Sequence, residues 1–370
     1  MDKLLEARET IDRIDKEMAK LFTERMKAVS DVAAYKKERG LCIFDSSREE
    51  EVIAKNTARI EDDVLRSYYT LFLQNTMTLS KQYQHSLMEG VRVAYSGVEG
   101  AFAHIAASRI FSNGVTVSHT DFTEAYQAVV NGKCDYAVLP IENSYAGEVG
   151  QVMDLMFAGS LFINGIYDLP ITQNLVGLAG TKAEDIKTVI SHPQALNQCQ
   201  GYIQKHGYKI EEAVNTARAA QEIVKRGDKS VAAIASAESA SLYGLSLLDH
   251  DINESSVNTT RFAVFSRVEN HTPLANQNTF LLLFTVNNVA GALAKAISVI
   301  GQHGFNMKVL RSRPVKEKAW QYYFYVEAEG DAHSEAGKKM LTDLKNHCDK
   351  LKIVGSYAIE LHLEESEARV

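Results

Sequence analysis

Three basic side chains interrupt the apolar face of the first predicted helix. Arg8, Arg25 and Lys36 lie at or beside positions where the helical period calls for apolar residues. Such side chains either cover apolar surface while their charged ends reach water, or bind an anion in a buried site, because an unpaired buried charge is costly. Three of them on one helix favour the anion site.

The spacing of these cations limits what the anion can be. Arg25 and Lys36 share a helix face and lie roughly 16 Å apart along the axis. Long side chains converging from that distance could hold the two ends of a small dicarboxylate. Arg8 lies ~26 Å from Arg25 by the same rise, too far for one small molecule. It would therefore contribute to the site of a partner chain.

A second group of polar residues lies at predicted strand ends. Residues 258–262 join amide, hydroxyl and guanidinium side chains, and polar loops cover residues 97–102, 140–144 and 191–195. In open α/β sheets, ligands bind beyond the carboxyl ends of strands, where such loops and helix N-termini meet. Taken singly, each loop is also explained by turn and cap chemistry.

The elements that must position these residues fall into three segments. Residues 1–88 carry helical apolar periodicity throughout, and a helix this long needs something packed along it, so we expect a dimer. Residues 91–267 alternate strands with helices such as 194–206, which predicts α/β layers, largely parallel sheets and two lobes around a cleft. Residues 277–364 follow a β-α-β-β-α-β order, with a turn at 287–293 before a helix N-terminus that could bind a carboxylate. The alternative for this last segment is a purely structural ferredoxin-like domain.

Composition limits the class of protein. A length of 370 residues predicts two or three domains, and 45% hydrophobic with 24% charged residues is ordinary for a folded protein. The net charge of −7 argues against a nucleic-acid partner. The four cysteines form no CxxC pair, and no apolar run reaches the ~18 residues that span a bilayer. We expect a cytoplasmic protein without a membrane segment.

The helical segment resembles the all-helical chorismate mutase family. The residues that carry the resemblance are Arg8, Arg25, Lys36, Asp45, Arg48, Glu49, Ser80 and Gln84. It implies that Arg25, with Arg8 of the partner subunit, binds the carboxylates of chorismate. Lys36 and Gln84 would stabilise the ether oxygen, Asp45 and Glu49 would contact the hydroxyl end, and Arg48 and Ser80 would support them. Rearrangement of chorismate to prephenate needs donors aimed at the oxygen that gains charge, and no nucleophile, metal or cofactor.

Residues 91–267 resemble prephenate dehydratase. The matching runs are A-Y-S-G-V-E-G-A-F-A-H, P-I-E-N-S, S-H-P-Q-A-L and N-T-T-R-F, with Val98 where a proline is usual. The resemblance implies loss of water and carbon dioxide from prephenate, with no redox cofactor. It makes Thr260 the donor to the leaving hydroxyl and Arg261 the anchor on the carboxylate side, in a dry, preorganised site. The other residues expected to line the site are Glu142, Asn143, Ser144, His192, Gln194, Thr216 and Phe262.

The last segment resembles the ACT regulatory domain, which pairs with its twin and binds an amino acid between chains. The turn at 287–293 and the run L-R-S-R-P carry the resemblance, although Ala290 replaces a usual proline and Arg311 a usual glutamate. It implies feedback inhibition by L-phenylalanine. The residues expected to bind the effector are Gly291, Ala292, Leu293, Asn306, Arg311, Ser312, Arg313 and Pro314.

The combined expectation is a multidomain, bifunctional enzyme of phenylalanine biosynthesis. Its parts would be an all-α mutase domain (1–88), a two-lobed, periplasmic-binding-protein-like α/β dehydratase domain (91–267) and an α+β ferredoxin-like ACT domain (277–364). Two other interpretations stay open: a ligand sensor without turnover, and a dehydratase whose helical segment only dimerises. Assays with chorismate and with prephenate, without added cofactor, separate the three.

Overall fold

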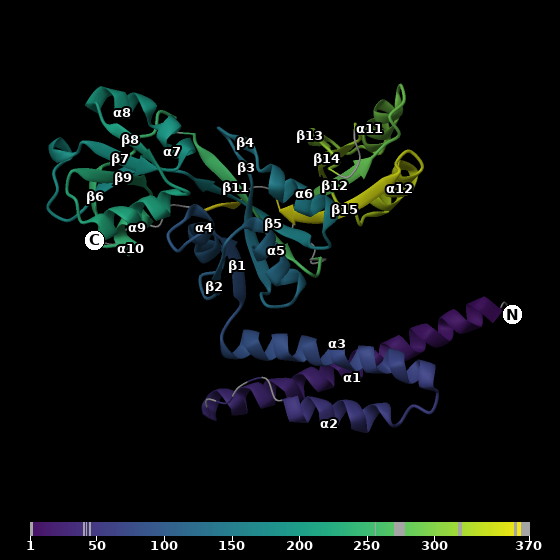
Figure 1. Cartoon of the computed structure of the whole chain (residues 1–370). Helices are drawn as coiled ribbons and strands as arrows, with labels where there is room; N and C mark the ends of the chain where they lie inside the picture. The colour runs from purple at the N-terminus through teal and green to yellow at the C-terminus, as the bar shows by residue number, and fades with distance from the viewer. Residues whose placement is uncertain are drawn as a thin grey trace. The chain divides into compact units, whose positions relative to one another are not determined.

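The computed structural model describes residues 3–39, 41, 43, 46–255, 257–269, 278–316, 320–358 and 361–363. The chain divides into two compact units. The first comprises residues 1–92 with the short segment 113–115, and the second comprises residues 93–112 and 116–370 (Figure 1). Within the described ranges, no helix is both long and apolar enough to cross a membrane.

The first unit consists of three helices, α1 (Lys3–Arg39), α2 (Ser46–Thr57) and α3 (Asp63–Met88). Asp62 begins α3, because its carboxylate accepts the backbone N–H of Leu65 at 2.8 Å. Both α1 and α2 pack along α3. On α1, apolar side chains such as Ile11 and Leu21 are 55% and 63% exposed. The single chain therefore leaves much of this apolar face uncovered.

The second unit begins with a lobe whose strands follow the order β5-β11-β3-β1-β2. The strands are β1 (Arg92–Ser96), β2 (Val115–His119), β3 (Tyr136–Asn143), β5 (Phe162–Pro170) and β11 (Thr259–Ser266), with the short β4 (Gly147–Glu148) paired to β3. The helices of this lobe are α4 (Phe102–Ile110), α5 (Phe122–Val130) and α6 (Gly150–Ala158).

The direction of β11 departs from the sequence prediction. Strands β1 and β3 are parallel as expected, but β11 runs antiparallel to both of its neighbours, β3 and β5. The chain leaves this lobe after β5 and returns from the second lobe, so the first residues of β11 lie beside the last residues of β3 and β5. The expectation of a largely parallel sheet is wrong for this strand.

The second lobe has its own sheet, in the order β10-β6-β9-β7-β8. Its elements are β6 (Asn174–Gly177), η1 (Ala183–Asp185), β7 (Thr188–Ser191), α7 (Pro193–Gln198), α8 (Gln200–His206), β8 (Lys209–Glu212), α9 (Thr216–Arg226), β9 (Val231–Ala235), α10 (Ala237–Leu242) and β10 (Ser246–Asp249). The prediction of one helix over 194–206 is wrong. The helix breaks at Cys199, and the Glu254 carboxylate accepts the N–H of Gly201 at 2.7 Å, which satisfies a donor at the start of α8.

The C-terminal part of the second unit has the predicted β-α-β-β-α-β order. It comprises β12 (Asn278–Thr285), α11 (Ala292–Gln302), β13 (Met307–Pro314), β14 (Tyr322–Glu329), α12 (Glu335–Lys345) and β15 (Lys350–Ala358), followed by the short β16 (Leu361–His362). Its sheet has the order β13-β14-β12-β15. We call residues 278–363 the C-terminal unit of this larger body.

The sheet of the C-terminal unit continues into the sheet of the first lobe. Strand β15 pairs with β5 where Gly355 lies beside Ile163, and β16 pairs further along β5. Gly355 has a φ of +150°, and a Cβ there would lie 2.1 Å from the carbonyl oxygen of Ile163. Only glycine allows the two backbones this approach.

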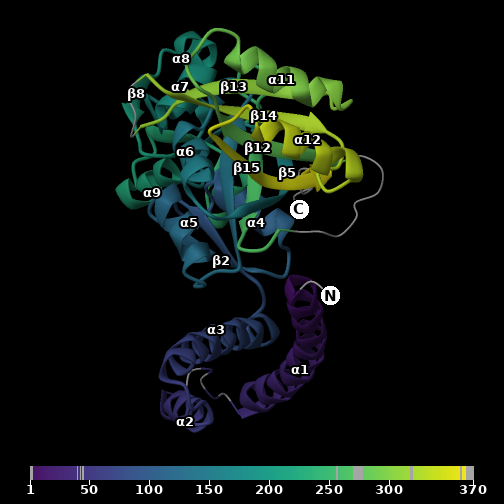
Figure 2. The ribbon, with the colours of Figure 1, turned by 90° about the vertical axis from the view of Figure 1, so that its right-hand side faces the viewer.

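Both faces of β12, at the centre of this sheet, are buried. One face packs Phe280 and Phe284 against α11 and α12 (Figure 2). The other face joins Leu281 and Leu283 to first-lobe residues such as Ile163 in a single apolar core. The C-terminal unit is thus attached to the first lobe by a shared sheet and a shared core.

Candidate active sites

The alternation of side chains along β11 separates the predicted residues onto two faces of the sheet. Thr260 lies opposite Asn143 on β3, whereas Arg261 lies opposite Glu142 on β3 and Asp168 on β5. Because successive strand residues point to opposite faces, hydroxyl and amide groups share one face and charged groups share the other. We call these the amide face and the charged face.

On the amide face, Asn143 is the centre of a hydrogen-bond network. Its side-chain oxygen accepts the backbone N–H groups of Tyr145 and Ala146, at 3.0 and 2.9 Å. Two backbone donors require an acceptor, so they fix which end of the carboxamide is nitrogen. That nitrogen then donates toward the Thr260 hydroxyl oxygen at 2.9 Å and the Thr259 carbonyl at 3.2 Å. With its oxygen engaged as an acceptor, the Thr260 hydroxyl keeps its proton for another partner.

The network extends from Asn143 into the second lobe. Gln194, near the start of α7, donates to the Asn143 oxygen at 3.1 Å, which links the two lobes directly. The Asn143 nitrogen also donates to Asn258 at 3.0 Å, and Asn258 donates to Gln198 at 3.0 Å. Among the residues that the structure describes, the Gln198 amide nitrogen is buried and has no partner. Sequence reasoning did not single out Gln198, and only its place four residues after Gln194 could have drawn attention to it.

Three predicted residues of this region have structural partners. The Ser144 hydroxyl donates to the Val257 carbonyl and accepts the Thr259 N–H, both at 3.0 Å, so it holds the backbone at the start of β11 in place. The His192 ring accepts the Gln194 N–H at 3.2 Å and caps α7. Phe262 is 2% exposed and packs in the core, so the structure does not place it on a substrate-accessible surface as predicted.

The start of α9 lies near the amide face of the first lobe. Thr216 is the first residue of α9 and is 7% exposed, and Asn215 caps the helix by accepting the Arg218 N–H at 2.7 Å. A Cβ on Gly97, in the loop after β1, would lie 3.8 Å from the Asn215 side chain. The N-terminus of α9 therefore lies beside the loop at the end of β1, and helix N-termini stabilise anions.

His192 is held as a neutral ring. Burial lowers the pKa of His192, and the nearby Glu212 carboxylate only partly opposes this effect. A neutral imidazole can accept a hydrogen bond, as it does from Gln194, but at neutral pH it carries no charge to bind a carboxylate. The ring is thus suited to shaping the loop.

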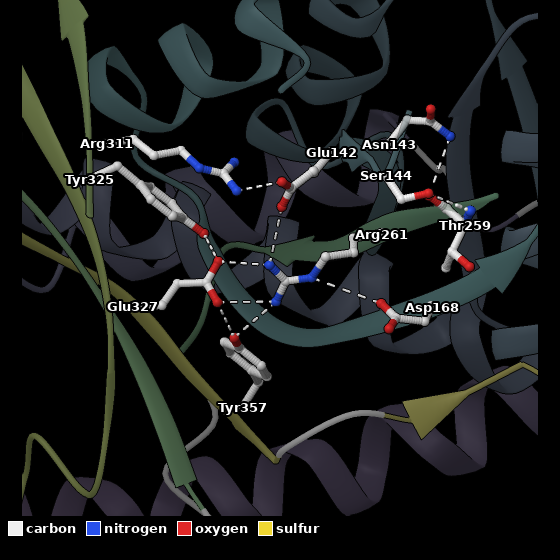
Figure 3. A network of polar contacts seen from close by, with 10 residues as sticks. All are labelled: Glu142, Asn143, Ser144, Asp168, Thr259, Arg261, Arg311, Tyr325, Glu327 and Tyr357. Carbon is white, nitrogen blue, oxygen red and sulfur yellow. Dashed lines mark hydrogen bonds and ion pairs between the residues drawn. The ribbon is translucent and has the colours of Figure 1, made fainter. Parts of the chain in front are cut away.

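The charged face contains a network centred on Arg261 (Figure 3). The guanidinium donates to both carboxylate oxygens of Glu327, at 2.9 and 3.0 Å, and to the Tyr357 hydroxyl at 3.2 Å. Glu142 and Asp168 lie at 3.4 and 3.8 Å. The prediction that Arg261 binds the substrate carboxylate does not fit this arrangement, because the side chain points away from Thr260 and is already paired with a carboxylate.

The electrostatics of the pair agree with this geometry. Burial acts to lower the pKa of Arg261, but the Glu327 carboxylate raises it above its usual value. Glu327 is 3% exposed, and burial acts to raise its pKa, yet the Arg261 guanidinium brings it below the usual value. Both groups are therefore ionised at neutral pH.

Sequence reasoning missed Glu327, although a signal was present. Strand alternation places Glu327 on the same face as Tyr323 and Tyr325, so a carboxylate interrupts a row of buried aromatic residues. A charge at such a position needs a partner. What the sequence could not supply was the identity of that partner, Arg261, which lies in another segment of the chain.

The first unit brings together part of the set predicted on its helices. Arg25 donates to Ser80 across α1 and α3, and Gln84 lies one turn further along α3. Burial lowers the pKa of Arg25. The Gln84 side-chain oxygen is buried and lacks a partner among the described residues.

The other predicted residues of this unit lie in different settings. Lys36 donates to the Ile43 carbonyl at 2.7 Å, and Glu49 pairs at 2.8 Å with Lys81, which sequence reasoning missed. Arg48 pairs at 2.7 Å with Glu51 on the exposed side of α2. Arg8 is exposed on α1, and Asp45 lies outside the described residues.

The residues predicted to bind an effector divide between two surfaces. Gly291, with a φ of +80°, Ala292 and Leu293 lie at the start of α11. Along β13, Arg311 and Arg313 turn inward and contact Glu142 and Glu148 of the first lobe. The others lie at exposed positions, namely Asn306, Ser312 and Pro314. The two arginines are thus engaged by first-lobe carboxylates.

Known proteins resemble both units. Residues 7–85 match the family model described as chorismate mutase type II, and residues 93–270 match the model described as prephenate dehydratase. A bifunctional chorismate mutase/prephenate dehydratase of Aquifex aeolicus is 33% identical over 368 residues, covering 96% of this chain and 98% of that protein.

Solved structures resemble the second unit. A prephenate dehydratase from Arthrobacter aurescens in complex with L-Phe is 26% identical with a TM-score of 0.68, covering 72% of this chain and 90% of that chain. GqqA, described as a novel type of quorum quenching acylase, is 30% identical with a TM-score of 0.67, covering 72% of this chain and 97% of that one.

Proposed function

The chain belongs to the bifunctional chorismate mutase/prephenate dehydratase family, and from that premise we propose which residues carry each reaction. The protein rearranges chorismate to prephenate, then removes water and carbon dioxide from prephenate to give phenylpyruvate. The assignment of residues follows from the two clusters described above. We place the reactions in the cytoplasm, where a reducing environment suits the free Cys134, Cys199 and Cys348.

In the mutase domain, Arg25 binds a substrate carboxylate. Its burial makes an anionic partner favourable, and Ser80 orients it. Lys36 and Gln84 donate to the ether oxygen, which gains negative charge as the C–O bond breaks. Glu49, held by Lys81, receives the hydroxyl end of the substrate. The buried Gln84 carboxamide, whose oxygen has no partner among the described residues, supports a polar ligand at this position, and its NH₂ group is the end that donates to the ether oxygen.

The mutase site is completed by a second copy of the chain. The exposed apolar face of α1 supports dimerisation through this helix, and Arg8 lies too far from Arg25 to share its site within one chain. A complementation experiment tests this. Arg8→Ala and Lys36→Ala homodimers should each be inactive toward chorismate. An equimolar mixture should regain about a quarter of wild-type activity after subunit exchange, because half of the dimers are mixed and each of these has one intact site out of two. No recovery after subunit exchange would refute the shared site.

In the dehydratase domain, Thr260 gives its proton to the leaving hydroxyl. The observation that carries this proposal is the hydrogen bond from Asn143 to the Thr260 oxygen, which leaves the hydroxyl proton free. As the bond to the ring carboxylate breaks, its electron pair completes the aromatic ring and carbon dioxide leaves. The ring C–O bond breaks, and the hydroxyl leaves as water with the Thr260 proton, which solvent replaces. Polarisation by Asn143 in a site closed to water makes the hydroxyl a better donor.

We assign substrate binding to the amide face. The N-terminus of α9 at Thr216 is suited to the pyruvyl carboxylate, and Gln194 joins the two lobes around the ring. Thr260→Ala should abolish phenylpyruvate formation from prephenate, while prephenate formation from chorismate persists. Thr260→Ser should keep measurable dehydratase activity. Dehydratase turnover by Thr260→Ala at the wild-type rate would refute the assignment.

The C-terminal unit is proposed to be an ACT regulatory domain that binds L-phenylalanine. Its β-α-β-β-α-β order and the N-terminus of α11 at Gly291 support this role, and an effector carboxylate would be stabilised there. Calorimetric titration of the full chain with L-phenylalanine should detect binding, and the dehydratase rate should fall. Absence of both effects would refute regulation by this amino acid.

A further inference from the structure

Glu327 is a fully paired carboxylate that lies behind the catalytic strand. Both oxygens accept from Arg261, and the Tyr357 hydroxyl donates at 2.8 Å (Figure 3). The Tyr325 hydroxyl donates as well. A buried charge with this many donors is retained in one position, because any movement would break several charge-assisted hydrogen bonds.

The pairing of β11 with β3 is irregular at this position. Arg261 lies opposite Glu142, but Phe262 lies opposite Pro140, so the pairing with β3 skips a residue between them. A bulge interrupts the hydrogen-bond ladder and changes the direction of nearby side chains. The extra residue, Ile141, lies on β3, while β11 keeps a regular register with β5 from Thr259 to Val264. Pairing with β3 therefore does not by itself fix how Asn143 and Thr260 lie relative to each other.

Side chains behind the sheet supply the missing constraint. Arg261 is held by Glu327 from β14, and Glu142, the residue before Asn143, is held by Arg311 from β13. The two strands that carry Thr260 and Asn143 are each fastened from behind by a charge of the C-terminal unit. The positions of Thr260 and Asn143 thus depend on charged residues that lie on the other face of the sheet.

We infer that Glu327 is a positioning residue for the dehydratase reaction, which it serves by holding Arg261 and so fixing the direction in which β11 presents Thr260. This rests on the proposed role of Thr260. Glu327 does not share a face with the substrate, so it acts on turnover and leaves substrate binding nearly unchanged. A misplacement of about 1 Å at a reacting group can cost about 100-fold in rate.

Glu327→Gln tests the inference with little change of shape. The new amide places N–H groups against the N–H groups of Arg261, which removes the bidentate pairing. For prephenate, kcat should fall about 100-fold. KM should change less than about threefold, because an interaction that serves only the transition state lowers kcat alone. Chorismate turnover by the same preparation reports whether the protein is intact. Glu329→Gln, on the same strand but outside the network, should keep wild-type kcat.

A double-mutant cycle shows whether Glu327 acts through Arg261. Arg261→Gln and the double variant with Glu327→Gln should lose similar activity, because the second change removes nothing further. Losses that multiply, a raised KM at unchanged kcat, or wild-type kcat in Glu327→Gln would each overturn the inference. Glu327→Asp keeps the charge and should recover part of kcat, and it decides the question if the glutamine variant unfolds.

Failure of this inference is distinguishable from failure of the proposed function. Thr260→Ala is measured in the same assay. If Thr260→Ala keeps its activity, the assignment of the reacting hydroxyl is wrong whatever Glu327 does. If Thr260→Ala is inactive and Glu327→Gln is fully active, only the positioning role is wrong.

Discussion

Replacing Asn143 by aspartate tests the central assignment of the amide face with almost no change in size. The substitution Asn143→Asp exchanges the donating NH₂ for an oxygen. The groups that accept from it are the Thr260 hydroxyl at 2.9 Å, the Asn258 side chain at 3.0 Å and the Thr259 carbonyl at 3.2 Å. After the change, an acceptor faces three acceptors. The Thr260 hydroxyl can relieve this only by turning its proton toward the new carboxylate, away from the substrate.

The expected loss follows from these contacts. Removing one well-placed donor to the charge that develops in a transition state costs about 10²–10³ in kcat. We therefore expect dehydratase kcat to fall by about that factor. The buried Asn258 oxygen loses its donor, whereas the Thr259 carbonyl keeps the Ser144 N–H at 2.8 Å, so the free energy of unfolding should fall by about 1–3 kcal/mol. This is large against the ~5–15 kcal/mol that folds a protein.

A matched substitution separates these two effects. Asn164 on β5 donates to the Ser266 hydroxyl at 2.6 Å and to the Val268 carbonyl at 2.8 Å, at the far end of β11. Asn164→Asp should therefore show a similar loss of stability, measured by urea unfolding, with dehydratase kcat near wild type. The assay is phenylpyruvate absorbance from prephenate, with chorismate turnover as the internal control. An Asn143→Asp enzyme with wild-type kcat would refute the role of Asn143 and the free proton on Thr260.

Two further outcomes follow from the structure. Gly355→Ala places a Cβ 2.1 Å from the Ile163 carbonyl oxygen, so β15 must move away from β5. The melting temperature of the second unit should therefore fall by several degrees while mutase activity persists. An unchanged melting temperature would contradict the close approach of the two backbones. Burial lowers the pKa of His104, His119 and His192 in the folded chain. On acidification the unfolded chain therefore takes up protons first, near pH 6.5, and the stability present above that pH should fall as the pH drops below it. His192→Gln should make the free energy of unfolding, measured in urea from about pH 7.5 to 5.5, depend less steeply on pH.

The sequence predicted the order of elements and the loops that meet at the amide face. Strands such as Thr188–Ser191 and Val231–Ala235 can be read from the sequence, because short β-branched and apolar runs between turn residues leave few alternatives. Alternation along β11 was also readable from the sequence, and it would have placed Thr260 and Arg261 on opposite faces. The resemblance of N-T-T-R-F to a family motif placed Thr260 and Arg261 in one site, although adjacent residues of a strand point to opposite faces.

Long-range contacts set the limits of the prediction. The break between α7 and α8 depends on Glu254, which lies 53 residues after Gly201 in the sequence, and helical periodicity carries no information about it. The joining of the C-terminal unit to the first lobe depends on Gly355, which looks like an ordinary strand glycine until Ile163 lies against it. Glu327 was visible as an anomaly in a row of tyrosines, but only the fold identifies Arg261 as the group it holds.

The pairing of β15 and β16 with β5 also bears on solubility. Strand β5 is nine residues long, and its outer edge is covered only by residues near the end of the described chain. A dehydratase fragment cut before β12 would present that edge, with its open N–H and C=O groups, to other molecules, and such edges promote aggregation. The C-terminal unit therefore also covers a sheet edge that would otherwise be open. A soluble fragment without the C-terminal unit would need lysine or proline placed along the open edge of β5.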